Sequence, residues 1–233
     1  MKVGLRSTVL LAALMASLGT ARGAVVSYDA AFGPIPVPFP STPLVSLPLF
    51  DPSLGTLVKV TLTLDAETFA GVISWDNEAG VMTDVTLGIG AEVTATGLAG
   101  VAATAVPLQT DTGLGIAADD DGAPDFVGAD SFTVAGGVGV DSDSDELTGV
   151  GVAPYVGLGF FDVFVDAIVS TFVSTTGGFG PIAPVPGVTA GLVTVTYEYI
   201  TGPIVPEPST ALVVGLGLGA MVIGTRLRRR RAA

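Results

Sequence analysis

Cysteine and histidine are both absent from the 233 residues of this chain. Without cysteine the chain has no disulfide framework, no thiol nucleophile and no thiolate metal site. Without histidine the Ser-His-Asp triad, the zinc proteases and the usual transition-metal sites are excluded as well. Carboxylate chemistry therefore remains for catalysis, and oxygen ligation of calcium or magnesium remains for metal binding.

Basic residues are scarce between the two ends of the chain. Eight of the nine lysines and arginines lie in the terminal segments, and residues 24–208 keep only Lys59 against all 22 acidic residues. One positive charge against 22 negative charges gives this part a formal charge of −21. Nucleic acids and anionic membrane surfaces would repel it, which excludes DNA or RNA binding. A strongly acidic surface suits divalent cations and keeps an exported protein soluble.

The first residues have the pattern of a secretory signal peptide. Lys2 and Arg6 precede an apolar run from Val9 to Leu18, and Ala21-Arg22-Gly23 supplies small residues at the cleavage positions. We therefore predict a signal helix within residues 1–23, with cleavage after Gly23. The alternative is a retained N-terminal helix, but the apolar run is short for a membrane span.

The last residues combine three elements in a fixed order. Val205-Pro206-Glu207-Pro208 is followed by an apolar run from Ala211 to Gly224 and then by an arginine cluster. The cluster consists of Arg226, Arg228, Arg229, Arg230 and Arg231. The prolines hold the chain extended around Glu207, a form that a processing enzyme can grip. The apolar run of about 16 residues predicts a short transmembrane helix. The arginine cluster predicts a cytoplasmic stop, with residues 24–205 on the other side of the membrane.

These three elements at the very end of the chain resemble the PEP-CTERM sorting signal of Gram-negative bacteria. The resemblance implies export across the inner membrane, a pause there as an intermediate, and processing near Pro206-Glu207-Pro208 by exosortase, a transpeptidase-like membrane enzyme. The processed protein would then reach the cell surface or an extracellular, exopolysaccharide-containing biofilm matrix. The alternative interpretation is a plain tail anchor. Residues 205–233 are thus expected to form a sorting and anchor segment.

Residues 24–204 are predicted to form one exported, all-β domain, an antiparallel β-sandwich. Residues of alternating polarity, rich in Val, Ile and Thr, occur from Leu57 to Leu64, from Val81 to Ala95 and from Leu192 to Ile200. Such alternation is typical of half-buried strands. The predicted interior side chains are Val60, Leu62, Ile73, Val85, Leu87, Val163, Val193 and Val195. Proline-rich residues 24–55 are expected to follow a sheet edge, with a short strand at Val45–Phe50.

A second resemblance covers about residues 40–200. The segment from Phe50 to Leu57, with Val60 to Leu64 after it, is similar to the opening of the choice-of-anchor E domain. Residues 121–128 and 155–159 resemble later segments of that domain. The resemblance implies an exported β-rich body with no known catalytic activity. From the residues alone, Pro52 sets a turn, and Phe50 and Leu54 are expected to close one end of the sandwich.

Two acidic runs, Asp119–Asp130 and Asp141–Glu146, are expected on a long acidic loop between Thr110 and Leu147. Alternate aspartates on a flexible loop can converge their oxygens on calcium. The candidate ligands are Asp119, Asp121, Asp125, Asp141, Asp143 and Asp145. Neither run matches an EF-hand, which would place a bidentate glutamate at Gly128 or at Val152. The alternative is a solvated acidic loop, so calcium is the one cofactor left open.

No enzyme is predicted. Asp111-Thr112-Gly113 is similar to the aspartic-protease triplet, but it occurs once, with polar neighbours, and is expected to be a turn. One tryptophan and four tyrosines are few for the sugar-stacking surface of a carboxylate glycosidase. The sequence favours a non-catalytic exported surface or matrix protein. The alternative is a calcium-dependent carbohydrate- or protein-binding module.

Overall fold

The computed structural model describes residues 22–201, which form β-strands joined by turns. The strands are β1 (Arg22–Pro36), β2 (Phe39–Pro48), β3 (Thr56–Phe69), β4 (Val72–Asp76), β5 (Thr83–Thr96), β6 (Ala102–Ala105), β7 (Leu108–Ile116), β8 (Ser131–Ala135), β9 (Val138–Thr148), β10 (Phe160–Thr175), β11 (Ile182–Val185) and β12 (Val188–Thr201). Short 3₁₀ turns lie at Pro52–Leu54, Leu98–Gly100 and Gly149–Tyr155. No helix among residues 22–201 is long and apolar enough to cross a membrane. The apolar runs of the predicted signal and transmembrane helices lie outside the described residues.

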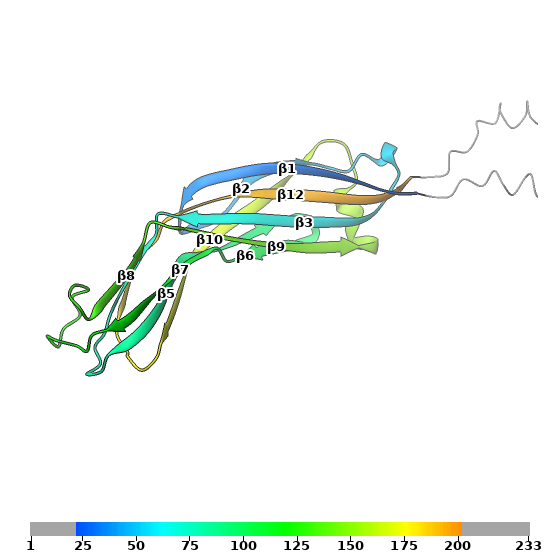
Figure 1. The fold of residues 1–233 in the computed structure, drawn as a ribbon. Helices are drawn as coiled ribbons and strands as arrows, with labels where there is room; N and C mark the ends of the chain where they lie inside the picture. The colour runs from blue at the N-terminus through cyan, green and yellow to red at the C-terminus, as the bar shows by residue number, and fades with distance from the viewer. Residues whose placement is uncertain (1–21, 202–233) are drawn as a thin grey trace, which may run out of the picture. The chain divides into compact units, whose positions relative to one another are not determined.

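Antiparallel pairing arranges the strands in three sheets, which Figure 1 shows as ribbons. Sheet A has the order β1-β12-β3-β9, and sheet B has the order β2-β10-β5-β6 with β7 also paired to β5. Sheet C is small and has the order β11-β4-β8. Residues 23–200 form one compact unit. The prediction of an all-β body with antiparallel strands is thus confirmed, and the architecture is sandwich-like.

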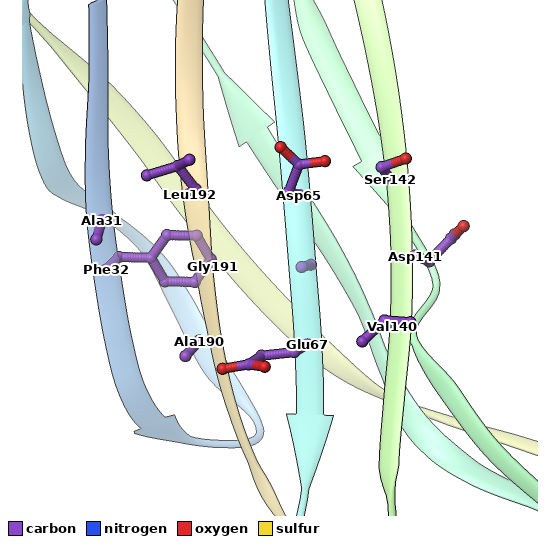
Figure 2. Close-up of a pocket in the computed structure, with 11 residues that line it drawn as sticks. Ala31, Phe32, Asp65, Glu67, Val140, Asp141, Ser142, Ala190, Gly191 and Leu192 are labelled. Atoms are coloured by element: carbon purple, nitrogen blue, oxygen red, sulfur yellow. The ribbon is translucent and has the colours of Figure 1, made fainter.

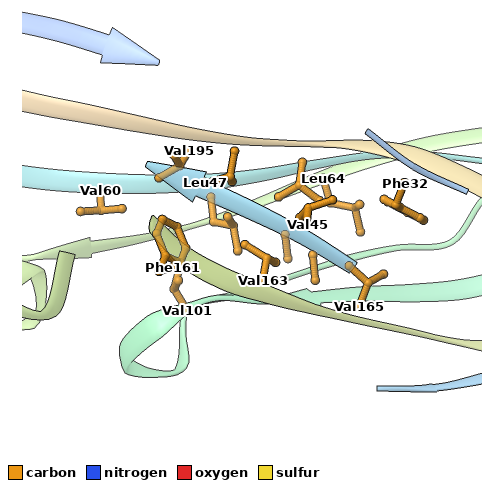
Figure 3. Packing of buried hydrophobic residues seen from close by; sticks show 14 of the residues in the cluster. Phe32, Val45, Leu47, Val60, Leu64, Val101, Phe161, Val163, Val165 and Val195 are labelled. Atoms are coloured by element: carbon orange, nitrogen blue, oxygen red, sulfur yellow. The ribbon is translucent and has the colours of Figure 1, made fainter. Parts of the chain in front are cut away.

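Sheets A and B meet across the main hydrophobic core, part of which Figure 3 shows. Val60, Leu62 and Leu64 of β3 enter it from sheet A, and Val163 and Val165 of β10 enter it from sheet B. Fully burying such a side chain contributes about 1.5–3 kcal/mol. All eight predicted interior side chains are at most 1% exposed: Val60, Leu62, Ile73, Val85, Leu87, Val163, Val193 and Val195. The period of two therefore identified the buried side chain correctly at all eight of these positions.

A second core lies beneath sheet C. It contains Ile73 and Trp75 of β4 together with Val85, Leu87 and Ile89 of β5. The next inward residues of β5, Ala91, Val93 and Ala95, belong to the main core instead. One long strand thus contributes to both cores, because its alternation continues unbroken along its whole length. The predicted β-sandwich has two sheets, whereas residues 22–201 form three.

The proline-rich segment forms full edge strands rather than a lead-in with one short strand. β1 is the first strand of sheet A and β2 is the first strand of sheet B. Proline has no N–H to donate, so it is tolerated where only one side of a strand is paired. The predicted edge position is confirmed, and the strands are longer than the sequence indicated.

Three local expectations at the ends of strands are wrong. Leu54 does not close the end of the sandwich, because it is 40% exposed, whereas Phe50 is buried. Asp111-Thr112-Gly113 is not a turn but part of β7, paired with β5. The alternation from Leu57 to Leu64 indicates that Val58 faces inward together with Val60. Val58 is instead a bulge residue of β3, because Glu198 of β12 pairs with Lys59 and Tyr199 pairs with Leu57. Below the bulge the parity changes, so Leu57 is buried and Val58 is 36% exposed.

This bulge predicts unequal effects of two neighbouring substitutions. Leu57→Ala is expected to lower the free energy of unfolding by about 2–5 kcal/mol, the usual cost of emptying a buried leucine site. Val58→Ala, the matched control, is expected to cost about 0.5 kcal/mol because this side chain partly faces solvent. Urea unfolding of both variants measures the difference. A larger loss at Val58 than at Leu57 would contradict the bulge.

Candidate functional site

The second acidic run is strand β9, not a loop, and its aspartates bind backbone N–H groups of a neighbouring strand. Three carboxylate Oδ2 atoms accept hydrogen bonds from alternate residues along β6 and just beyond it. The bonds join Asp141 to Val106 at 2.7 Å, Asp143 to Thr104 at 2.8 Å and Asp145 to Ala102 at 3.1 Å. We call this row the carboxylate ladder.

The carboxylate ladder follows from the position of β9 in the fold. Asp143 pairs with Leu64 and Asp145 pairs with Leu62, whose side chains are buried, so the aspartates are on the inner face of sheet A. β9 is the last strand of sheet A, and β6 is the last strand of sheet B. At this margin the inward side chains meet the unpaired N–H groups of β6. Successive aspartates are about 6.6 Å apart along the strand, so each has its own partner.

The first acidic run does lie in a loop, residues 117–130 between β7 and β8. Its aspartates accept hydrogen bonds from the loop's own backbone N–H groups. Asp119 Oδ1 binds Asp121 at 3.2 Å and Gly122 at 2.7 Å, Asp121 Oδ1 binds Ala123 at 2.8 Å, and Asp125 Oδ1 binds Val127 at 2.9 Å. Bonds of this kind fix the turns of a loop. Asp119, Asp121 and Asp125 therefore shape the loop with one oxygen each.

Two buried carboxylates enter this loop from the ends of sheet C strands. Asp76 is the last residue of β4 and is 2% exposed, and Asp130 directly precedes β8 and is 4% exposed. Asp76 Oδ2 accepts from the N–H groups of Asp125 at 2.8 Å and Phe126 at 3.2 Å. Asp130 Oδ2 accepts from the N–H of Asp120 at 3.4 Å. The Oδ1 atom of each is buried and has no hydrogen-bond partner.

Gly128 gives Asp130 the room to approach the loop. A Cβ atom at position 128 would lie 2.9 Å from Asp130 Oδ1, and Gly128 has a φ of +99°. A side chain there would both collide with the carboxylate and strain the backbone.

Negative charge surrounds these carboxylates. The charge of Asp130 is the largest cause that raises the pKa of Asp120, and Asp121 and Asp125 add to it. Burial raises the pKa of Glu78, and the charges of Asp119, Asp76, Asp121 and Asp130 raise it further. The lysine of the body is elsewhere. On sheet A, Lys59 Nζ pairs with Glu146 at 2.8 Å and with Glu198 at 3.1 Å. It does not neutralise the loop.

The calcium ligands predicted from the sequence are separated in the structure. Asp119, Asp121 and Asp125 share the loop, whereas Asp141, Asp143 and Asp145 form the carboxylate ladder. Within residues 22–201, no three acidic side chains already surround one point. The sequence did not single out Asp76. Only the pairing of β4 with β8, which puts Asp76 opposite Ser131, brings it to the loop.

An open hollow of about 750 Å³ lies on sheet A, as Figure 2 shows. All four strands of the sheet contribute to its lining. Asp65 and Glu67 are alternate residues of β3 and extend on the same side, and Ser142 of β9 pairs opposite Asp65. Carboxylate and hydroxyl oxygens of this kind accept hydrogen bonds from a hydroxyl-rich ligand.

Two segments on which the choice-of-anchor E resemblance is based meet at one end of the main core. The N–H of Phe50 donates to the carbonyl of Tyr155 at 2.8 Å, and the N–H of Gly157 donates to the carbonyl of Phe50 at 3.0 Å. The Tyr155 hydroxyl donates to the Leu98 carbonyl at 3.0 Å. Burial raises the pKa of Tyr155, so the hydroxyl stays protonated as a donor. These contacts give the motif residues a packing role.

Comparison with protein-family models finds no match to the chain, and comparison with curated proteins finds no match either. The sorting residues Val205, Pro206, Glu207 and Pro208 and the arginine cluster lie outside the described residues.

The carboxylate ladder predicts a local change in amide exchange. Asp143→Ala removes the acceptor of the Thr104 N–H, and that amide proton is expected to exchange about fivefold faster, which corresponds to a hydrogen bond of about 1 kcal/mol. Ser142→Ala is the matched control, because its side chain points to the other face of β9. Hydrogen exchange followed by NMR measures both variants. Unchanged protection of Thr104 in the Asp143 variant would refute the bond.

Proposed function

We propose that this chain is an exported, non-catalytic protein of the cell surface or extracellular matrix of a Gram-negative bacterium, sorted by a PEP-CTERM signal. The observation that carries the proposal is the ordered tail from Val205 to Arg231: an extended Pro-Glu-Pro element, an apolar run and an arginine cluster. An exosortase-type membrane enzyme is the expected processing partner. The inner membrane is a temporary location.

The tail explains why export would stop and then resume. Moving one arginine through the centre of a membrane costs several kcal/mol, and five together block translocation. The apolar run from Ala211 to Gly224 would therefore stay in the inner membrane with the arginine cluster on the cytoplasmic side. Glu207 is the only charged residue between Glu198 and that run. Held between two prolines, its carboxylate is a fixed recognition group for the enzyme.

Two properties of the body support an extracellular location. It carries a large negative charge, and its lysine is paired on sheet A. Such a charge keeps a protein soluble at high local concentration. The carboxylate ladder covers the margin of sheet B, where unpaired N–H groups could otherwise pair with another chain.

The tryptophan and two of the tyrosines support the non-catalytic part of the proposal. A carboxylate glycosidase needs two acidic groups across a cleft and benefits from exposed rings that stack on sugars. Here the single tryptophan, Trp75, is buried in the second core, and Tyr155 and Tyr197 are fully buried in the main core. These three rings fill the interior and cannot stack on a sugar, and the exposed rings are those of Phe160, Phe164, Phe172 and Phe179.

A second candidate function is a carbohydrate- or protein-binding module. The observation that favours it is the hollow on sheet A, where Asp65, Glu67 and Ser142 offer oxygens to a ligand. A hydroxyl-rich polymer such as the producer's own exopolysaccharide fits this chemistry better than an acidic one, because acidic groups would be repelled. Binding of this kind is compatible with the sorting route proposed above.

The sorting proposal predicts a block in processing. Glu207→Ala, or alanine in place of both Pro206 and Pro208, is expected to leave the unprocessed protein in the inner membrane, because the recognition group or its rigid frame is lost. Glu92→Ala on β5 is the control and is expected to be processed like the parent. Membrane fractionation with immunoblotting measures the two forms. Processing and release of the Glu207 and proline variants at the parental rate would leave a plain tail anchor.

The hollow predicts a loss of polymer binding. Asp65→Ala combined with Glu67→Ala is expected to weaken retention on the producer's exopolysaccharide about tenfold, the effect of losing hydrogen bonds worth about 1.4 kcal/mol in total. Glu92→Ala on sheet B is again the control and should bind as the parent does. A pull-down with increasing polymer concentration measures retention. Equal binding by the double variant would remove the hollow as the site.

A further inference from the structure

We propose that the loop of residues 117–130 binds one calcium ion through the free Oδ1 atoms of Asp76 and Asp130, with the carboxylate of Asp120 as a third ligand. This inference concerns the body alone and does not depend on the proposed sorting route. It also differs from the sequence prediction, which placed the ligands at Asp119, Asp121 and Asp125 and in β9.

Two buried carboxylate oxygens at this loop lack a hydrogen-bond partner. Asp76 and Asp130 are each more than nine-tenths buried, and each uses Oδ2 to bind a loop N–H while Oδ1 has no partner. A buried charged oxygen without a partner is strongly unfavourable, so each one in a native fold requires an explanation. Because both carboxylates hold the same loop through Oδ2, a single ligand bound there could be the missing partner of both Oδ1 atoms.

The missing partner is expected to be positively charged. The side chains whose charges act on the loop carboxylates are themselves acidic, namely Glu78, Asp119, Asp121 and Asp125. Lys59 is engaged with two glutamates on sheet A. The described residues around the loop therefore offer no positive group to Asp76 and Asp130. A cation from solution would satisfy both free oxygens and reduce the repulsion between Asp120 and Asp130.

The kind of cation follows from the ligands. The chain has neither cysteine nor histidine, so the ligands are oxygens, which favours calcium or magnesium over transition metals. Calcium accepts about six to eight oxygen ligands in flexible geometry, including backbone carbonyls and water, whereas magnesium requires a strict octahedron. An irregular loop that joins two strand ends suits the flexible requirement of calcium.

The proposed ligands lie close together in the fold. Asp76 and Asp130 are held by the ends of β4 and β8, where the N–H of Asn77 donates to the Asp130 carbonyl at 3.0 Å. Asp120 is exposed on the loop, and its N–H already contacts Asp130. The Asp120 side chain is thus already beside Asp130, whose charge is the largest influence on it, and one cation would have to join these two carboxylates to that of Asp76.

The site would also connect the loop to the second core. Asn77 Nδ2 donates to the carbonyl of Val81 at 2.9 Å and to the carbonyl of Ala117 at 2.6 Å, where the loop begins. Trp75, two residues before Asn77, fills that core. Calcium at Asp76 and Asp130 would therefore stabilise sheet C as well as the loop.

The test is thermal unfolding of the full-length chain in mild detergent, with calcium chloride, magnesium chloride or a chelator at equal ionic strength. Calcium is expected to raise the Tm by about 5 °C when its concentration is well above Kd. Calorimetric titration should give one ion per chain. Asp76→Asn and Asp130→Asn are expected to weaken binding at least tenfold, and the exposed Asp29→Asn on β1 is the matched control.

In the Asp120→Asn variant the change in Tm relative to the parent is expected to reverse its sign between chelator and calcium. This test does not require the buried Asp76 and Asp130 variants to fold well. In chelator this variant should have a higher Tm than the parent, because a like charge beside Asp130 is removed. In calcium it should have a lower Tm than the parent, because a ligand is lost. The proposal is overturned if calcium does not raise the parent's Tm, if magnesium raises it equally, or if the calcium effect persists in the Asp76 and Asp130 variants. Water as the partner of the free oxygens would give the first of these results.

Discussion

The margin of a β-sheet exposes a row of backbone N–H groups, and each row must be paired or blocked. In this body the strands inside each sheet are paired on both sides. The unusual residues, prolines and alternate aspartates, are found in the edge strands. Proline-rich β1 and β2 occupy edges where missing N–H groups do no harm. Aspartates of β9 cover the edge of β6 through the carboxylate ladder. The acidic composition thus serves the fold as well as solubility.

The strands could be predicted from the sequence wherever a hydrophobic period of two continues without interruption. β3, β5 and β12 show it, and their inward residues are buried as the pattern indicates. In β10 the outward residues Phe160, Phe164 and Ile168 are apolar as well and are exposed. The pattern fails at Val58, because a bulge on one strand depends on the register of its partner. It also fails at β9, whose inward positions are aspartates. Polarity indicated a loop there, but the partner of these side chains is another strand's backbone.

The candidate metal ligands could be predicted only in part, for a related reason. Asp119, Asp121 and Asp125 are close in sequence, so their loop was recognisable. Asp76 reaches the same loop through the pairing of β4 with β8, and no local pattern announces a partner that is distant in sequence. The tail is the opposite case. In the sorting route proposed above, a processing enzyme would recognise it as a linear signal, so the order of its residues would itself be the information.

The carboxylate ladder also has a consequence for how β9 can vary between related sequences. Positions 141, 143 and 145 each need a short side chain that accepts a hydrogen bond, so aspartate or asparagine can occupy them. Ser144 lies on the other face of β9 and makes none of these bonds, so it is free to change. Evolution would then preserve aspartate or asparagine at every second position. In an alignment such a pattern would look like a metal-binding loop. Its spacing of two residues instead reflects the alternation of side chains between the two faces of a strand.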